Sequence, residues 1–198
     1  MHYRAKKIRK RLFGIGVQST NRLEEMLGLL AHEPDDVFWS VFNYCWSSCE
    51  DTWDLRGRVL GELRRRNRNG SPWREGWFAS LPEQFPIYRG GSLWRANGLS
   101  WTFDPDVAAS FARGHRGMAI TDPVIASVTI KKSSRAILFA TNNDNEMELL
   151  IDYGRFPPRK LTLAPVTELT TFTDDGHWVI AHRRSRGLDA DPALKVGL

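Results

Sequence analysis

The sequence predicts an α+β protein in which a small helical subdomain precedes a part built on antiparallel β-structure. Before about residue 70, apolar side chains recur at the spacing of buried helix faces, whereas after residue 86 they form short runs separated by turn residues. Only one short helix is expected among those later runs, so the crossover helices that a parallel sheet requires are missing. We therefore expect a basic arm with a helical subdomain over residues 1–80 and a β-rich domain over residues 81–198.

Three helices are expected in the first part, behind the basic arm. Ser19-Thr20-Asn21 offers N-cap side chains for the first, whose apolar residues follow at i, i+3, i+4 and i+7. The second begins after Pro34 and is rich in large apolar side chains, which favours core packing over base stacking. The third begins near Thr52 and ends where residues 67–72 carry turn formers. The first apolar face consists of Leu23, Met26, Leu27 and Leu30.

The second part contains a series of short strands. Asp104 followed by Pro105 has the pattern of an N-cap with proline in the first helical turn, so the one later helix should start there. No glycine-rich phosphate loop and no internal repeat are present. The expected strands cover residues 87–89, 99–103, 124–130, 136–140, 148–151, 161–166 and 177–181.

Composition limits the class of protein. The chain has 198 residues, 41% of them hydrophobic and 11% aromatic, which suits a folded globular domain. No apolar run approaches the roughly 20 residues that span a bilayer. The charged start lacks the apolar segment of a signal peptide, so we expect a cytoplasmic protein without a membrane partner.

Two cysteines, Cys45 and Cys49, lie four residues apart in an expected helix. This spacing favours reduced thiols in a reducing compartment over a disulfide framework. A metal site would require two further ligands, and none of the five histidines is close in sequence. We therefore expect no metal.

The net charge of +5 is unevenly distributed along the chain. Basic residues cluster at 4–11, at 56–68 and at 182–186. Such clusters are commonly solvated surface, but they are also the electrostatic footprint of proteins that bind nucleic acids or other polyanions. Charge alone does not decide between the two.

Three polar elements are candidates for one site. Arg89 lies on a short β-like run, and Ser100 and Thr102 share one face of the next because strand side chains repeat every two residues. Glu146 and Glu148 come later and lead into an apolar strand. Together these residues form an anion-binding arginine, a hydroxyl support and an acidic pair.

The order of these elements resembles the arginine, Ser-x-Ser/Thr and Glu-x-Glu pattern of mono-ADP-ribosyltransferases of the R-S-E class. The resemblance covers about residues 85–182, and the segment 98–104 with its following helix is similar to bacterial and phage transferases. In the related NAD-degrading RES toxins the acid precedes the serine, which is not the order here. The resemblance implies a split antiparallel β-sandwich that binds NAD in a central cleft, with NAD as a substrate and no metal.

The resemblance also implies roles for the arginine segment. Arg89 would hold the diphosphate or the neighbouring ribose through its planar guanidinium. The backbone of Gly90 would bind the nicotinamide amide, and Asn97 would help to hold the adenosine side. Ser100 would orient the catalytic glutamate.

Four further residues complete the implied cofactor site. Trp101 and Thr102 would shape the strand beneath the nicotinamide, and Arg113, or Arg116, would reach phosphate. Phe111 would stack on the nicotinamide, although an ordinary helix-to-sheet contact explains it equally well.

The two glutamates would carry the chemistry. Cleavage of the nicotinamide–ribose bond builds positive charge on the ribose, which a fixed carboxylate at Glu148 would stabilise. Glu146, expected on the same strand face, would position or deprotonate the acceptor nucleophile.

The acceptor remains open between two classes. In the family, Glu-x-Glu accompanies transfer to protein arginine, whereas the basic clusters, the Arg64–Arg66 run and the aromatic helices favour a nucleic-acid base, in RNA more than DNA. We expect an intracellular toxin of a toxin–antitoxin or phage-defence system, with an antitoxin as a possible partner. The alternatives are an NAD glycohydrolase and a non-catalytic basic nucleic-acid-binding protein.

Overall fold

The computed structural model describes residues 3–50, 52–67, 77–114, 120–141, 147–155, 162–166, 170–172 and 178–180. The chain divides into two compact units. The helical unit comprises Met1–Ser80 with Ile137–Asp152, and the sheet unit comprises Leu81–Ala136 with Tyr153–Leu198. The helical unit thus combines two separate stretches of the chain, of which Ile137–Asp152 carries strands.

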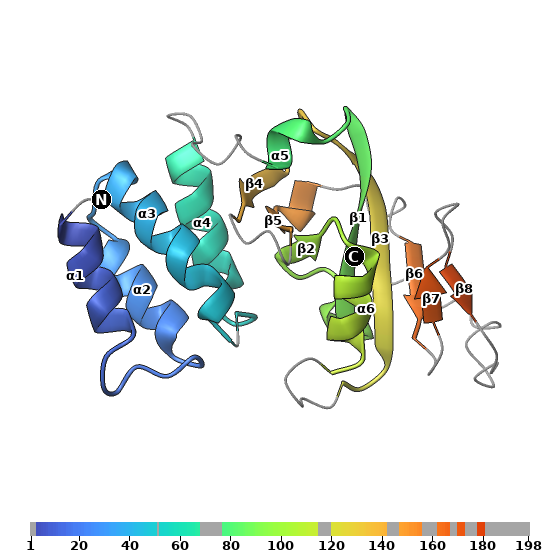
Figure 1. Cartoon of the computed structure of the whole chain (residues 1–198), viewed down its shortest axis with the longest axis horizontal. Helices are drawn as coiled ribbons and strands as arrows, with labels where there is room; N and C mark the ends of the chain where they lie inside the picture. Colours follow the sequence, from blue (N-terminus) through green and yellow to red (C-terminus); the bar gives the residue numbers. More distant parts are fainter. Residues whose placement is uncertain are drawn as a thin grey trace. The chain divides into compact units, whose positions relative to one another are not determined.

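Helices form most of the helical unit (Figure 1). α1 packs against α3, and α2 contacts both of them. The helices are α1 (Tyr3–Leu12), α2 (Arg22–Leu30), α3 (Asp35–Cys45), the 3₁₀ turn η1 (Trp46–Ser48), α4 (Arg56–Arg66) and the short α5 (Trp77–Ser80).

The expected apolar faces are buried, with two corrections near the start of the chain. All four apolar residues predicted on the α2 face are buried. The residues described as a basic arm form helix α1 instead, because Ala5, Ile8 and Leu12 recur on one face and are buried. Asn21 makes no side-chain cap to α2; its Oδ1 accepts from the backbone N–H of Gln18 at 2.8 Å.

The core of the helical unit is aromatic. Phe42 stacks on Phe38 and on Trp46 at centroid distances of 5.2 and 5.3 Å. Phe139, from strand β4 (Ile137–Ala140), stacks on Trp39 at 5.5 Å. β4 pairs antiparallel with β5 (Glu148–Ile151), and every residue of both strands is buried. The predicted core packing is confirmed for Phe38, Trp39 and Phe42 of α3, whereas Tyr44 in the same helix is exposed.

The sheet unit is built on antiparallel strands in the order β2-β1-β3-β6 (Figure 1). Their bounds are β1 (Gln84–Ser92), β2 (Ser100–Thr102), β3 (Pro123–Lys131) and β6 (Thr162–Pro165). Tyr88 pairs with Thr102, and Arg89 pairs with Ala126. The 3₁₀ turns η4 (Leu93–Arg95) and η6 (Tyr153–Arg155) belong to the same unit.

Helix α6 (Pro105–Ala112) covers β1. Its N-cap is Asp104, whose carboxylate accepts from the backbone N–H groups of Asp106 and Val107, as the sequence predicted. The face toward the sheet consists of small residues, which allow the helix to approach closely. The small core there contains Tyr88, Ala108, Ala109, Ala112 and Ile125.

A separate two-stranded sheet pairs β7 (Thr170–Phe172) with β8 (Trp178–Ile180). β8 falls in the predicted strand at 177–181, whereas β7 was not predicted. The architecture is therefore helices combined with antiparallel strands, which confirms the α+β class. None of the helices in the described ranges is long and apolar enough to cross a membrane.

Candidate active site

Glu148 is the first residue of β5 and is buried, with 7% of its surface exposed. Its carboxylate Oε1 accepts a hydrogen bond of 2.8 Å from the indole Nε1 of Trp46. Its backbone carbonyl accepts from the N–H of Thr141 at 2.9 Å. A neighbouring strand and an indole donor thus fix both the main chain and the side chain of this glutamate.

The residue before Glu148 has an unusual backbone. Met147 has φ of +42°, in the left-handed region that non-glycine residues adopt at a cost of roughly 1 kcal/mol or more. β5 begins at Glu148, so Met147 lies just before the strand. Glu146 itself lies outside the described residues.

The 3₁₀ turn η1, which contains Trp46, is hydrogen-bonded to α2. The guanidinium of Arg22 donates to the backbone carbonyl of Ser48 at 2.5 Å and to that of Leu12 at 3.1 Å. Trp46 is 3% exposed and stacks on Phe42. The donor to Glu148 is therefore held in a rigid position.

Two free thiols lie beside this turn, and the helix expected to contain both ends at Cys45. Burial raises the pKa of Cys45 to about 11. Burial, followed by the proximity of Cys45, raises the pKa of Cys49 to about 12, with a smaller contribution from the charge of Glu148. Both thiols are protonated at neutral pH and are poor nucleophiles.

Arg89 extends from β1 across the connection to β2. Its Nη1 donates to the carbonyl of Ser100 at 2.6 Å, and its Nε donates to the carbonyl of Arg95 at 3.1 Å. Gly98 lies against the guanidinium: a Cβ there would be 2.2 Å from Nη2. The loop between β1 and β2 thus holds the guanidinium in one place and has no room for a side chain at residue 98.

Gly90 has a packing role that the sequence did not indicate. A Cβ at this position would lie 1.7 Å from the carbonyl oxygen of Ala108 in α6. Asn97 is exposed in the loop, and Ser100 is half-buried at the start of β2.

Trp101 and Thr102 are buried parts of the sheet unit. Trp101 is 1% exposed, donates from Nε1 to the carbonyl of Gly98, and stacks parallel to Tyr153 at 6.4 Å. Thr102 accepts from the backbone N–H of Asp104 through Oγ1. Both therefore support the strand and the following cap from within the core, and Trp101 has almost no exposed surface.

Phe111 and Arg113 lie at the end of α6. Phe111 is half-buried and is not part of the small core under the helix. Arg113 is exposed, and its backbone N–H closes the helix on Ala109. Arg116 lies outside the described residues.

The residues of the expected site are divided between the two units. Arg89 and Ser100 meet through the hydrogen bond across β1 and β2, and the other expected NAD-binding residues also belong to the sheet unit. Glu148 belongs to the helical unit. The sequence did not identify Trp46 as the partner of Glu148, because the two residues are 102 positions apart. Nothing in the local sequence distinguishes Trp46 from the other aromatic residues around it.

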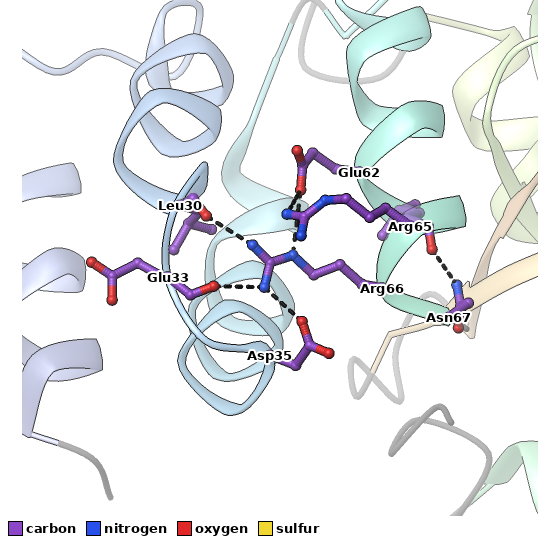
Figure 2. A network of polar contacts seen from close by, with 8 residues as sticks. Leu30, Glu33, Asp35, Glu62, Arg65, Arg66 and Asn67 are labelled. Carbon is purple, nitrogen blue, oxygen red and sulfur yellow. Dashed lines mark hydrogen bonds and ion pairs between the residues drawn. The ribbon is translucent and has the colours of Figure 1, made fainter. Parts of the chain in front are cut away.

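The arginine run at the end of α4 is largely used inside the helical unit (Figure 2). Arg66 is 1% exposed, donates to the carbonyls of Leu30 and Glu33, pairs with Asp35 and Glu62, and lies over the ring of Phe38.

The two arginines that precede it are also paired. Arg64 makes a bidentate contact with buried Asp152, which raises the pKa of the guanidinium, and Arg65 pairs with Glu62 at 2.7 Å. The predicted nucleic-acid footprint therefore does not include Arg66, and its neighbours already have acidic partners.

Other basic residues remain on the surface of α1. Lys6 and Lys10 are exposed and share one face of α1, because residues four apart lie on the same side of a helix. Phe13 is 47% exposed and meets Tyr44, 56% exposed, edge to face at 5.7 Å. Arg22 and Arg9 cover these two rings, each at 4.4 Å.

No cluster of three or more metal-binding side chains occurs within the described part of the chain. No protein-family model matches this chain, and neither a curated protein nor a solved structure matches it. Function is therefore inferred from the site residues and from their order in the sequence.

Proposed function

We propose that this protein is an NAD-dependent mono-ADP-ribosyltransferase with a β-sandwich of that family's type. The observation that carries the proposal is the contact of Arg89 with the backbone of Ser100, because it joins the first two motifs of the R-S-E pattern across adjacent strands. The third motif supplies a buried, hydrogen-bonded carboxylate at Glu148.

The chemistry fits these groups. A guanidinium held on a rigid strand is suited to the diphosphate of NAD. As the bond between the ribose C1′ and the nicotinamide nitrogen breaks, the departing nicotinamide takes the bonding electrons and the ribose becomes oxocarbenium-like. A pre-oriented carboxylate stabilises that charge. The acceptor nucleophile then forms a bond to C1′ and loses its proton, the step for which Glu146 is the candidate base.

Protein arginine and a nucleic-acid base are both candidate acceptors. The Glu-x-Glu motif favours arginine. The exposed Lys6 and Lys10 of α1 favour a nucleic acid, since contacts with phosphate groups carry most of the non-specific affinity for it. In either case we propose a toxin that acts in the cytoplasm of the cell producing it, within a toxin–antitoxin or phage-defence system and with an antitoxin protein as partner.

The same surface also supports a second candidate, a basic nucleic-acid-binding protein without catalysis. It predicts binding that weakens steeply with salt and is unaffected by Glu148→Gln, with no NAD consumption. An NAD glycohydrolase would instead release free ADP-ribose.

The test is incubation of the protein with labelled NAD and a whole-cell lysate, followed by separate digestion with protease and nuclease. Glu148→Gln should abolish at least 99% of the label, because the amide can still accept from Trp46 but carries no charge. Glu24→Gln, an exposed glutamate 3.7 Å from Arg58, is the matched control and should label as the unmutated protein does.

The digestion identifies the acceptor. Label lost under nuclease indicates a nucleic acid, and label lost under protease indicates a protein. Free ADP-ribose without a labelled macromolecule would favour the glycohydrolase. Unchanged NAD in all samples would overturn the enzyme proposal.

A further inference from the structure

The carboxylate of Glu148 is held by a residue from outside the segment that carries the transferase-like motifs. Trp46 lies in η1, after α3, and its Nε1 donates to Oε1 of Glu148 at 2.8 Å. Both partners are buried, at 3% and 7% exposure. A hydrogen bond to an ionised acceptor in such surroundings is stronger than one between neutral groups.

The position of this indole is determined by several contacts. Its ring stacks on Phe42, which in turn meets Phe139 edge to face at 5.3 Å. The carbonyl of Trp46 accepts from the backbone N–H of Cys49, and Arg22 bonds to the carbonyl of Ser48 in the same turn. The indole N–H is therefore pre-oriented before any substrate binds.

The geometry points to Trp46 as the positioning residue of the catalytic carboxylate, because both residues belong to the helical unit and are joined by a buried hydrogen bond. This inference rests on the proposed transferase function. A carboxylate that stabilises charge on C1′ must be fixed to within about half an ångström, and a rigid donor to one of its oxygens provides such a constraint. Trp46 would thus share the orienting role that the sequence gave to Ser100 alone.

The chain offers a matched pair of variants. Trp46→Phe removes the donor and retains an aromatic ring for Phe42. Trp77→Phe removes another indole hydrogen bond of 2.8 Å in the same unit, but its acceptor is the backbone carbonyl of Thr141. Each variant removes one indole donor and keeps an aromatic ring, so both should remain folded.

The first readout is independent of activity. In a ¹H–¹⁵N spectrum, the Trp46 indole signal of the unmutated protein should lie downfield and move upfield in Glu148→Gln, because a charged acceptor deshields the proton more than an amide. The Trp77 signal should not move. An unchanged Trp46 signal would overturn the inference.

The second readout is kinetic. Trp46→Phe should lower kcat for ADP-ribosyl transfer by about tenfold to a hundredfold with KM for NAD changed less than twofold, since the contact acts on the transition state. Trp77→Phe should leave both constants within twofold. Equal effects of the two variants on kcat would reduce Trp46 to a packing role and overturn the inference.

The two readouts also separate this inference from the proposed function. If the unmutated protein consumes no NAD, the transferase proposal fails and the catalytic role of Trp46 fails with it, while the spectrum still decides whether the indole holds the carboxylate. If NAD is consumed but the Trp46 signal does not shift in Glu148→Gln, only the positioning role of Trp46 is ruled out.

Discussion

At the scale of single residues, Arg66 shows how a side chain expected at the surface can belong to the core. Its guanidinium has two carbonyl acceptors, two carboxylate partners and an aromatic ring, and a planar fork suits such a set better than an ammonium group. Arg65, one residue earlier, pairs with Glu62, and half of its side-chain surface is exposed. The two adjacent arginines therefore differ in what their removal costs.

We expect Arg66→Met to lower the free energy of unfolding by about 3 kcal/mol, because it leaves buried acceptors without their donor. Arg65→Met should change it by less than about 0.5 kcal/mol, as for other exposed ion pairs. Urea unfolding followed by circular dichroism measures both. A similar small loss in the two variants would contradict the network drawn in Figure 2.

Gly98 is the residue that makes room for Arg89. An alanine there would push the guanidinium from its place, since the atoms it meets belong to the end of a flexible side chain. We expect Gly98→Ala to fold normally and to bind NAD about tenfold more weakly, measured by calorimetry in the Glu148→Gln background to prevent turnover. Gly91→Ala, whose Cβ would meet no atom within 4 Å, is the control. Equal NAD affinity in the two variants would remove Arg89 from the NAD site.

At the scale of elements, the close packing of α6 on β1 depends on small residues in both elements. Ala108, Ala109 and Ala112 present small groups to the strand, and Gly90 lies directly beneath the helix backbone. The Asp104 cap fixes where the helix begins and so sets which residues face Gly90. The short helix and the strand therefore approach more closely than side chains on both would allow.

Gly90→Ala should lower the free energy of unfolding by about 2–3 kcal/mol, because the new Cβ meets helix backbone that cannot rotate away. The neighbouring Gly91→Ala should be neutral or stabilising by about 0.5 kcal/mol, since alanine is less flexible than glycine in the unfolded chain. Thermal melting compares the two. If the two variants have the same melting temperature, α6 does not lie on β1 as described.

At the scale of the whole molecule, several buried acids favour their protonated forms in the folded state. Burial raises the pKa of the two thiols, to about 11 at Cys45 and about 12 at Cys49 from an ordinary 9.0, and it also raises the pKa of Tyr88 and Tyr153. Below pH 9 the thiols are protonated in both states, so their contribution to stability is complete. As the pH rises above 9, the unfolded chain releases these protons first, and stability falls.

We therefore expect the free energy of unfolding to decrease between pH 9 and pH 11 by up to about 1.4 kcal/mol per pH unit for each thiol. Urea unfolding of the unmutated protein and of the Cys45→Ala/Cys49→Ala variant over this range isolates the thiol contribution, because the tyrosines and lysines are common to both. The double variant should show the shallower slope. Identical slopes would mean that the thiols are as accessible in the folded protein as in the unfolded chain.

Local patterns in the sequence determined several elements of this protein and its fold class. The apolar spacing of α2, the proline start of α6 and the bounds of β5 follow from side-chain periodicity and cap chemistry, which act over a few residues. The α+β class follows from the same local signals. The candidate site residues Arg89, Ser100 and Glu148 were likewise proposed from their order in the chain, and this proposal stays a prediction.

Only the tertiary structure decided what these residues contact. The pairing of Trp46 with Glu148, the burial of Arg66 and the packing of Gly90 under α6 join segments distant in sequence, and no periodicity encodes which partner a side chain meets. Likewise, the basic start of the chain became a helix because its three apolar residues found a core to cover. The physical reason is that burial and buried hydrogen bonds gain their strength from the surroundings that folding creates.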